Sequence, residues 1–579
     1  MNTIDQATNN RIQQWLSAEY DAETVGQVQK LVDDKQETEL IDSFYKELEF
    51  GTGGLRGIMG VGSNRMNKYT IGKATQGLAN YLKQQFPDQD VKVAVSYDSR
   101  NNSQKFGQLV ADVFAANGIH VYLFKELRPT PMLSFAVRHF GCQGGVMLTA
   151  SHNPKEYNGY KAYWNDGGQL VAPHDKNVIT EVNAIQSVSE IKFDGISENI
   201  TLVGEDFDQL YIDANTQLSI HPEAVAAQSD LKIVFSSIHG TGITIVPKML
   251  EAWGFKNVQV VDEQATPDGN FPTVVYPNPE EEEAMSMAKR KGQDIDADVV
   301  MATDPDADRV GLAVKNHNGE IQLLNGNQIG SLLTYYVLSS KKENGTLKEN
   351  DFIVKTIVTS NLISDIGTGF GVKNYETLTG FKFIGEVITQ VEGKENYLVG
   401  GEESYGFLVG DLVRDKDAVN ACAFIAEMAA YFKNQGKSLF DVLLEIYETY
   451  GFYQEKLISL TKKGKAGADE IKQMMADLRA NAPQSLGGVA VKEIRDYENS
   501  VSNVLADNSQ SNIDLPKSDV LQFITVDGDV ISARPSGTEP KIKFYCSVKE
   551  SLANRSAYEE TAKKLEEKVK NIMADIVKD

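Results

Sequence analysis

Three aspartates, Asp304, Asp306 and Asp308, occupy alternate positions in the segment DPDADR. If this segment is extended, the three carboxylates face the same way and converge on one point. Such a cluster repels itself unless a cation lies within it, and an all-oxygen site favours a hard ion such as Mg²⁺. A solvated acidic turn is the alternative, but the apolar run ADVVMAT (297–303) precedes the aspartates, and Arg309 adds a group that pairs with phosphate. The pattern therefore predicts a magnesium site, and it lacks the downstream Gly and Glu of an EF-hand.

A possible nucleophile follows another apolar run. Ser151 comes directly after GVMLTA (145–150), His152 is its neighbour, and Lys161 lies ten residues later. A serine placed at a strand-to-loop turn beside such groups is suited to activation or to phosphorylation. Ser, Asn and Pro are also common turn formers, so a plain turn is the alternative. A hydrolase triad is disfavoured because no G-x-S-x-G surrounds Ser151.

A third polar segment, GEESYG, contains Glu402 and Ser404, and Thr379 and Lys382 lie shortly upstream. A carboxylate and a hydroxyl together can hold two neighbouring hydroxyls of a sugar. Taken alone, this segment is better explained as a charged surface loop. We interpret it as a sugar site only in combination with the others.

The fourth segment, RPSGTEPK, has the chemistry of an anion site. Arg534 offers a bidentate fork, Ser536 and Thr538 offer hydroxyls, and Gly537 lets backbone N–H groups curl around an anion. A hairpin turn rich in Pro and Gly is the alternative. Near the start of the chain, the glycine-rich segment GTGGLRG contains Arg56, but it is neither a Walker sequence nor a dinucleotide fingerprint and means little in isolation.

Strands that alternate with helices position these segments, which predicts largely parallel sheets whose ligands bind beyond the carboxyl ends of the strands. The patterns predict strands at 91–97, 119–124, 145–150, 231–237, 257–261, 297–303, 352–360 and 396–400, and helices at 103–117, 243–253, from 280, 418–435 and 438–450. The tail differs, with helices at 467–480 and 556–576 and hairpin-like strands around 520–533 and 541–548.

The length of 579 residues is too great for one hydrophobic core. We expect an α/β protein with three consecutive α/β domains, whose sheets are mixed and mostly parallel, and a C-terminal α+β domain. The expected boundaries are a helical extension at 1–45, domain I with Ser151 at 46–210, domain II with the metal segment at 211–325, domain III with the sugar segment at 326–455, and domain IV with the phosphate segment at 456–579.

Charge and cysteine content narrow the function. The chain has 57 basic and 81 acidic residues, a net charge of −24 that repels nucleic acid and anionic membranes. Any phosphate site must therefore concentrate cations locally. No apolar N-terminal region or membrane-length apolar run is present, and three separated cysteines fit a reducing cytoplasm.

Taken together and in this order, the segments GTGGLRG, TASHNP, DPDADR, GEES and RPSGTEP resemble the α-D-phosphohexomutase family of phosphoglucomutases and phosphomannomutases. The resemblance extends from Gly51 to Lys541. The extended N-terminus and the form GGEESYG look most like bacterial phosphoglucomutases related to the phosphoglucomutase-2 and phosphopentomutase branch.

The resemblance implies a heart-shaped enzyme of four domains around a central cleft, with one segment from each domain in the active site. It implies that Ser151 is phosphorylated in the resting enzyme and ligates Mg²⁺ together with the three aspartates. It further implies that the sugar phosphate is bound by Arg309, Thr379, Lys382, Glu402 and Ser404. Its non-reacting phosphate would be bound by Arg534, Ser536, Gly537 and Thr538. The residues that act on the transferring group would be Arg56, His152 and Lys161, with Lys161 or His152 as general base and acid.

The resemblance also implies the reaction. A phosphoglucomutase interconverts glucose 1-phosphate and glucose 6-phosphate through a phosphoserine and a glucose 1,6-bisphosphate, which also serves as activator. Alternatives are a phosphomannomutase or phosphopentomutase of the same mechanism, a magnesium-dependent sugar phosphatase, and a sugar-phosphate sensor without turnover. The expected partner is a small sugar phosphate, not nucleic acid or a membrane, and the expected assembly is a monomer or a homodimer.

Overall fold

The computed structural model describes residues 4–51, 53–462, 464–536 and 541–577. The chain divides into two compact units. Unit 1 comprises Met1–Gly326, Phe381–Val399 and Ser404–Gly436, and unit 2 comprises Asn327–Gly380, Gly400–Glu403 and Lys437–Asp579. Among the described residues, no helix has the length and apolar character needed to cross a membrane.

The first sheet of unit 1 has six strands, and it carries the Ser151 segment at the end of one of its inner strands. Its order is β1 (Gly54–Ile58), β5 (Tyr157–Trp164), β4 (Gly144–Leu148), β2 (Lys92–Tyr97), β3 (His120–Phe124) and β6 (Ile200–Val203). Strands β4, β2, β3 and β6 run parallel to one another, whereas β5 is antiparallel to both β4 and β1. The sheet is therefore mixed and mostly parallel.

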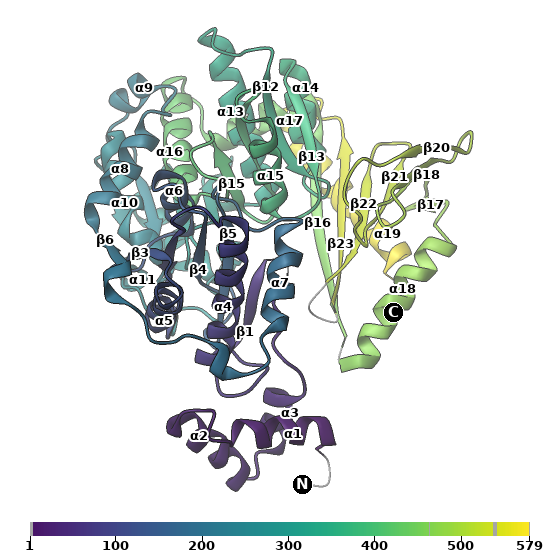
Figure 1. Cartoon of the computed structure of the whole chain (residues 1–579). Helices are drawn as coiled ribbons and strands as arrows, with labels where there is room; N and C mark the ends of the chain where they lie inside the picture. Colours follow the sequence, from purple (N-terminus) through teal and green to yellow (C-terminus); the bar gives the residue numbers. More distant parts are fainter. Residues whose placement is uncertain (1–3, 52, 463, 537–540, 578–579) are drawn as a thin grey trace. The chain divides into compact units, whose positions relative to one another are not determined.

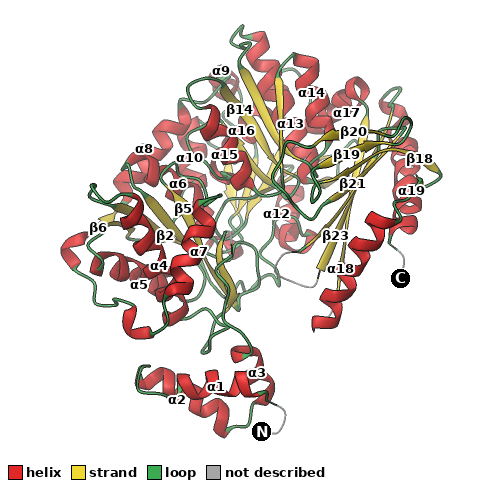
Figure 2. Ribbon diagram, turned by 45° about the vertical axis from the view of Figure 1, so that its right-hand side comes forward, coloured by secondary structure: helices red, strands yellow, loops and turns green. Residues whose placement is uncertain are grey.

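Helices cover both faces of this sheet (Figure 2). Successive residues of a strand point to opposite faces. Gly144 of β4 lies against Leu82 of α4 (Lys68–Gln85), and the next residue, Gly145, lies against Val137 of α6 (Thr130–His139). Burial on both faces explains the apolar run VAV (93–95) in β2 and the wholly apolar sequence of β4, and it explains why both sequences were recognisable as strands.

The second sheet of unit 1 has five strands, ordered β11 (Ile321–Leu324), β10 (Val310–Lys315), β9 (Val299–Thr303), β7 (Ile233–Ser236) and β8 (Val258–Val260). Strand β7 is parallel to β8 and β9, and β10 is antiparallel to β9 and β11. The aspartate segment follows β9, whose five residues are all buried.

The N-terminal residues form a helical group at the bottom of Figure 1, and its hydrophobic cluster includes Tyr69 at the start of α4. Its helices are α1 (Gln6–Trp15), α2 (Ala22–Asp33) and α3 (Glu37–Phe44), as the sequence predicted for residues 1–45. Trp15, Tyr20 and Phe44 form an aromatic cluster with Tyr69 at the start of α4. The helices of this extension therefore share a core with the first sheet's helical layer.

The other helices of unit 1 lie around its sheets, and the sequence predicted those near 103–117, 243–253, from 280 and 418–435 but none of the others, nor α4 and α6. These other helices are α5 (Ser103–Ala116), α7 (His174–Ala184), α8 (Glu205–Thr216), α9 (Pro222–Ala227), α10 (Val246–Trp253), α11 (Asp262–Ala265), α12 (Glu282–Ile295), α15 (Phe381–Val391) and α16 (Ala418–Asn434). Strand β14 (Asn396–Glu402) begins in unit 1 and ends in unit 2, and β15 (Gly406–Val409) belongs to unit 1.

Unit 2 contains a parallel pair, β12 (Asp351–Thr356) and β13 (Lys373–Thr377), with α13 (Gly326–Glu343), α14 (Asn361–Phe370) and α17 (Leu439–Tyr450). The tail forms an antiparallel sheet of eight strands, in which β17 (Ser485–Leu486) pairs with β18. The other seven follow the order β16 (Phe452–Thr461), β23 (Lys541–Glu550), β22 (Val530–Pro535), β21 (Leu521–Thr525), β18 (Val489–Asp496), β19 (Val501–Val504) and β20 (Ser509–Asn512). Helices α18 (Gly464–Ala480) and α19 (Tyr558–Ile576) complete the α+β tail.

Candidate active site

Ser151 lies just beyond the carboxyl end of β4, in a loop that also includes His152. It is 3% exposed and has a positive φ of 51°, a conformation that residues other than glycine adopt at a cost. Its backbone N–H donates to the Thr149 hydroxyl at 2.8 Å. Its Oγ donates to Asp304 Oδ2 at 2.7 Å, and His152 Nδ1 lies 3.3 Å from Ser151 Oγ. Segments that are 153 residues apart in the sequence therefore meet at this hydroxyl.

The three aspartates converge, but not for the reason the sequence suggested. An extended segment was expected, and that expectation is wrong: residues 304–309 form a tight turn that joins the antiparallel strands β9 and β10. Ala307 adopts a positive φ of 49°, and Asp304 Oδ1 accepts the backbone N–H groups of Asp308 and Arg309, both at 3.1 Å. The turn wraps around its own carboxylates, and this brings one oxygen from each aspartate within 4.8 Å of the others.

The residues of this turn fit a hard divalent cation. Asp304, Asp306 and Asp308 are at most 1% exposed, and Oδ1 of both Asp306 and Asp308 is buried without a hydrogen-bond partner among the described residues. Burial and the two neighbouring carboxylates raise the pKa of Asp304 well above its ordinary value. Unpartnered anionic oxygens at close range are the donor set that Mg²⁺ prefers.

Two lysines reach the same carboxylates. Lys161, on β5 opposite Met147 of β4, donates to Asp306 Oδ2 at 2.7 Å and to Asp308 Oδ2 at 2.9 Å. Lys416 Nζ lies 3.2 Å from Asp308 Oδ2 and 3.0 Å from Asp415 Oδ1. Burial raises the pKa of Asp308, but the neighbouring cations outweigh burial and hold this pKa below its ordinary value. Burial lowers the pKa of Lys161, but the neighbouring carboxylates outweigh burial and raise this pKa. The site thus holds cationic donors beside its anions.

His152 and two arginines complete the unit 1 part of the site. Burial and the neighbouring cations Arg309 and Arg56 lower the pKa of His152 well below its ordinary value, so the imidazole is neutral near pH 7. Arg309 Nη1 donates to Glu280 at 2.7 Å, and Arg56 Nη1 donates to Asn153 Oδ1 at 3.4 Å. The structure thus brings seven predicted residues together around Ser151: His152, Lys161, Asp304, Asp306, Asp308, Arg309 and Arg56.

In unit 2, Glu402 ends β14 and is 5% exposed, and its Oε1 accepts the N–H of Gly380 at 3.0 Å. Thr379, the residue before Gly380, has a buried hydroxyl with no hydrogen-bond partner among the described residues. The predicted residues Thr379 and Glu402 are therefore neighbours.

The neighbouring Glu403 accepts hydrogen bonds from the hydroxyls of Thr359 at 2.9 Å and Thr356 at 3.4 Å. Burial and Glu402 raise the pKa of Glu403. The two adjacent glutamates thus have different partners.

The other predicted binding residues lie in both units. Lys382, on α15 of unit 1, lies 3.9 Å from Asp175, and burial lowers its pKa. Ser404 is half-buried in unit 1. In unit 2, Arg534 of β22 is opposite Lys543 of β23, and Ser536 N–H donates to the Lys541 carbonyl at 2.7 Å. The predicted residues Gly537 and Thr538 lie outside the described residues.

Sequence reasoning missed several residues that contact this site. Lys416 and Asp415 were overlooked, although the run RDKD at 414–417 is an alternation of charges that a buried network could have explained. Thr130 was also overlooked, and its hydroxyl donates to Asp306 Oδ2 at 2.7 Å. Nothing in a single threonine after a proline signals such a contact.

Comparison with known proteins identifies the family. Four family models match, described as phosphoglucomutase/phosphomannomutase domain I over residues 47–189, domain II over 209–319, domain III over 325–450 and the C-terminal domain over 468–564. The chain belongs to the phosphoglucomutase/phosphomannomutase family. This membership agrees with the predicted fold class of three α/β domains and an α+β domain, and it makes the chain an isomerase that moves a phosphoryl group.

Two curated relatives come from staphylococci. A phosphoglucomutase of Staphylococcus haemolyticus (strain JCSC1435) is 38% identical over 505 residues, which cover 87% of this chain and 91% of the relative. A phosphoglucomutase of Staphylococcus aureus (strain MRSA252) is 38% identical over 522 residues, covering 90% of this chain and 93% of the relative.

Solved structures of the family share the fold. Parafusin, a phosphoglucomutase from Paramecium crystallised in an open form, has a TM-score of 0.67 at 19% identity and covers 92% of this chain and 96% of its own. A phosphoglucomutase/phosphomannomutase family protein from Burkholderia thailandensis has a TM-score of 0.63 at 17% identity, with coverage of 91% and 98%.

Proposed function

We propose that this protein is a phosphoglucomutase that interconverts glucose 1-phosphate and glucose 6-phosphate. The observation that carries the proposal is the hydrogen bond from Ser151 Oγ to Asp304 Oδ2 at 2.7 Å, inside a group of three buried aspartates, two of which Lys161 bridges. The curated relatives that bear the name phosphoglucomutase support the choice of glucose.

In the proposed cycle, Ser151 is the resting phosphoserine. The bond between phosphorus and Ser151 Oγ breaks while a bond forms to the free hydroxyl oxygen of the sugar phosphate. The neutral His152 accepts the proton of that hydroxyl, and Lys161, which the carboxylates keep protonated, donates a proton to Ser151 Oγ. The product is glucose 1,6-bisphosphate, which turns around and returns its other phosphoryl group to Ser151, while the proton of the Ser151 hydroxyl returns to Lys161 and His152 protonates the sugar oxygen that is released. Glucose 1,6-bisphosphate added from outside is then an activator, because it phosphorylates Ser151. Such transfers need positioning and charge neutralisation more than covalent chemistry.

We propose that Asp304, Asp306 and Asp308 hold Mg²⁺, with an oxygen on Ser151 as a further ligand. The unpartnered Oδ1 atoms of Asp306 and Asp308 support this assignment. A bound Mg²⁺ would neutralise negative charge on the transferring phosphoryl group. Lys161, which contacts the same carboxylates, keeps them oriented and keeps a cation beside Ser151.

Binding roles complete the proposal. Glu402 and Ser404, with Thr379 and Lys382, bind the sugar hydroxyls, and Arg534, Ser536, Gly537 and Thr538 bind the phosphate that does not react. Arg56 and Arg309 act on the transferring end. The acidic total of −24 makes such local cations necessary for any phosphate ligand.

We further propose that a helical extension ending at residue 45 is followed by four domains, with boundaries at residues 210, 325 and 455. We also propose that the protein is cytoplasmic. The free, buried Cys142, Cys422 and Cys546 support a reducing compartment. The proposed assembly is a monomer or a homodimer, which light scattering of the purified protein distinguishes.

The experiment is a substrate panel with a matched variant. Glucose, mannose, ribose and N-acetylglucosamine 1-phosphates are assayed with Mg²⁺ and a trace of the matching bisphosphate, and kcat/KM is compared. We expect glucose 1-phosphate to be preferred. We also expect Ser151→Ala to lose at least about a thousandfold in kcat while its melting temperature stays near that of the wild type. Substantial turnover of Ser151→Ala would contradict the nucleophile, and release of free phosphate in place of isomerised sugar phosphate would indicate a phosphatase.

A further inference from the structure

Arg100 lies beneath the Ser151 loop, which we define as residues 149–157. Arg100 belongs to the segment that connects β2 to α5, and its side chain is fully buried. Nη2 donates to the backbone carbonyls of Ser151 and Asn153. Nη1 donates to the carbonyls of Pro154 at 2.8 Å and Tyr157 at 3.1 Å. One guanidinium therefore satisfies four carbonyls of the loop that carries the proposed nucleophile.

The loop needs such support because of its backbone at Ser151. A residue other than glycine with φ near +51° is strained and keeps this conformation only when its surroundings fix it. The Thr149 hydroxyl accepts the Ser151 N–H, and Arg100 donates to the Ser151 carbonyl. The peptide groups on both sides of Ser151 are thus held, and this fixes the direction in which Oγ points.

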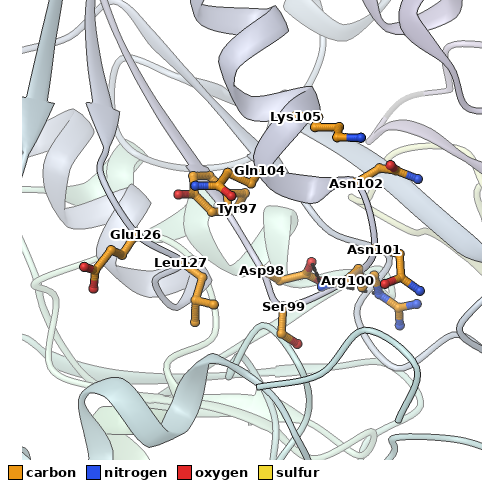
Figure 3. A pocket seen from close by; sticks show the side chains of 10 residues that line it. All are labelled: Tyr97, Asp98, Ser99, Arg100, Asn101, Asn102, Gln104, Lys105, Glu126 and Leu127. Carbon is orange, nitrogen blue, oxygen red and sulfur yellow. Dashed lines mark hydrogen bonds and ion pairs between the residues drawn. The ribbon is translucent and has the colours of Figure 1, made fainter. Parts of the chain in front are cut away.

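Arg100 is itself held in place before it meets the loop. Figure 3 shows Asp98 and Arg100 beside each other on the segment that leads into α5. Asp98 Oδ2 lies 3.4 Å from Arg100 Nε, and Asp98 Oδ1 accepts the Arg100 N–H at 2.9 Å and the Ser103 hydroxyl at 2.7 Å. The ring of Phe271 lies 5.1 Å from the guanidinium. The guanidinium is therefore preorganised for its four acceptors.

We infer that Arg100 is a positioning residue for phosphoryl transfer at Ser151, and that Asp98 orients Arg100 for this task. The inference rests on the proposed function of Ser151. The four hydrogen bonds that the Arg100 guanidinium donates to the loop all end on backbone carbonyls, so Arg100 acts through the backbone of the loop. A lysine cannot replace it, because a single ammonium cannot serve four carbonyls that a planar fork reaches together.

The test compares Arg100→Lys with Arg65→Lys. Arg65 is a matched control: it is also 3% exposed and donates to backbone carbonyls and carboxylates, but its partners are Glu39, Asp42 and Asn64 in and after the N-terminal helices. Three quantities are measured: kcat and KM for glucose 1-phosphate, transfer of radioactive phosphate from glucose 1,6-bisphosphate to Ser151, and amide hydrogen exchange of residues 150–157.

For Arg100→Lys we expect kcat and the rate of Ser151 labelling to fall about a hundredfold, since a displacement of the reacting atom by about 1 Å has that effect. KM should stay within about threefold of the wild type, because Arg100 does not touch substrate, and exchange in the loop should be faster. Arg65→Lys should keep kcat within about twofold. If Arg100→Lys fails to fold, Asp98→Asn, which leaves the guanidinium in place, should show a smaller loss of kcat with the same unchanged KM.

Two results would overturn the inference. One is faster loop exchange in Arg100→Lys with wild-type kcat and labelling, and the other is an equal fall of kcat in Arg65→Lys. Failure of the proposed function is a separate outcome, since a wild-type protein that is neither labelled at Ser151 nor active would show it. The exchange of residues 150–157 would still report whether Arg100 holds the loop.

Discussion

Thr130 holds Asp306 by both its side chain and its backbone. The Thr130 hydroxyl donates to Asp306 Oδ2 at 2.7 Å, and the Thr130 N–H donates to the Asp306 carbonyl at 2.9 Å. Thr130 is fully buried at the start of α6, a helix of the first sheet, whereas Asp306 follows a strand of the second sheet. The orientation of one proposed metal ligand therefore depends on a residue far from it in the sequence.

We expect Thr130→Val to weaken Mg²⁺ binding about tenfold, because residues that orient a metal ligand typically contribute 10–100-fold to affinity. Isothermal titration with Mg²⁺ measures this without reference to turnover. Thr75→Val is the control, since the buried Thr75 hydroxyl donates within α4 to the Ile71 carbonyl at 2.8 Å. Equal affinities in the two variants would show that Thr130 does not orient the ligand.

A second support for the aspartate turn comes from Gly240. A Cβ at Gly240 would lie 2.5 Å from Pro305 Cα, and the neighbouring Thr241 donates to the Pro305 carbonyl with both its N–H and its hydroxyl, at 2.8 Å and 2.9 Å. Gly240→Ala must therefore displace the turn. We expect Mg²⁺ affinity to fall at least about tenfold by the same titration.

Gly204→Ala is the matched control for this change. Gly204 has nearly the same backbone conformation, with φ −106° and ψ −164° against −100° and −169° at Gly240, but a Cβ there meets nothing within 4 Å. Wild-type affinity in Gly240→Ala would mean that the turn tolerates the displacement and that close packing at Pro305 is not needed for the metal.

The inner strands of unit 1 could be predicted because both of their faces are buried. β4 is apolar along its whole length, and β2 and β9 contain the apolar runs VAV (93–95) and VVMA (299–302), so their sequences alone predict strands, and the polar residues that follow β4 and β9 indicate the site. β5 was missed because its sequence, YNGYKAYW, mixes polar and aromatic residues without a period of two. Yet β5 is the strand that brings Lys161 to the aspartates.

The details of the site could not be predicted because they depend on contacts between distant segments. That Ser151 meets Asp304, or that Thr130 meets Asp306, follows from the packing of two sheets, which no local pattern reports. The turn at 304–309 was wrongly expected to be extended because alternation of aspartates mimics a strand, whereas the backbone N–H groups that Asp304 accepts fold the segment back.

The adjacent glutamates of GEES should differ in function. Glu402 Oε1 has one backbone donor, Gly380, whereas Glu403 is held by the hydroxyls of Thr359 and Thr356. If Glu402 binds the sugar, Glu402→Gln removes a charged acceptor and should raise KM for glucose 1-phosphate at least about tenfold, the equivalent of a charged hydrogen bond. Glu403→Gln is the control and should keep KM within about threefold. Steady-state kinetics of both variants decide it, and a larger rise of KM in Glu403→Gln would reverse the assignment.

Two aspartates at helix N-termini should make opposite contributions to the pH dependence of stability. Asp417 accepts the Asn420 N–H at the start of α16 and the Tyr211 hydroxyl at 2.6 Å, and burial raises its pKa to about 6. Asp21 accepts the Thr24 N–H at the start of α2 and the Tyr69 hydroxyl at 2.8 Å; burial raises its pKa, but these hydrogen bonds outweigh burial and lower it to about 2. Asp417 is 1% exposed, whereas the Asp21 side chain is 40% exposed.

Because the folded protein holds a proton on Asp417 more tightly than the unfolded chain does, the stabilisation from this proton is complete below pH 3.8 and is lost as the pH rises through 6. The free energy of unfolding of the wild type relative to Asp417→Asn should therefore fall by about 2 kcal/mol between pH 4 and pH 7. The wild type relative to Asp21→Asn should change the other way, with stabilisation present above pH 3.8 and lost as the pH falls through 2. Urea titrations of the three proteins from about pH 2 to about pH 7 measure both differences in the free energy of unfolding. If the difference in the free energy of unfolding between the wild type and Asp417→Asn does not change with pH, this carboxyl is ionised in the folded protein at pH 5. Its hydrogen bonds would then outweigh its burial.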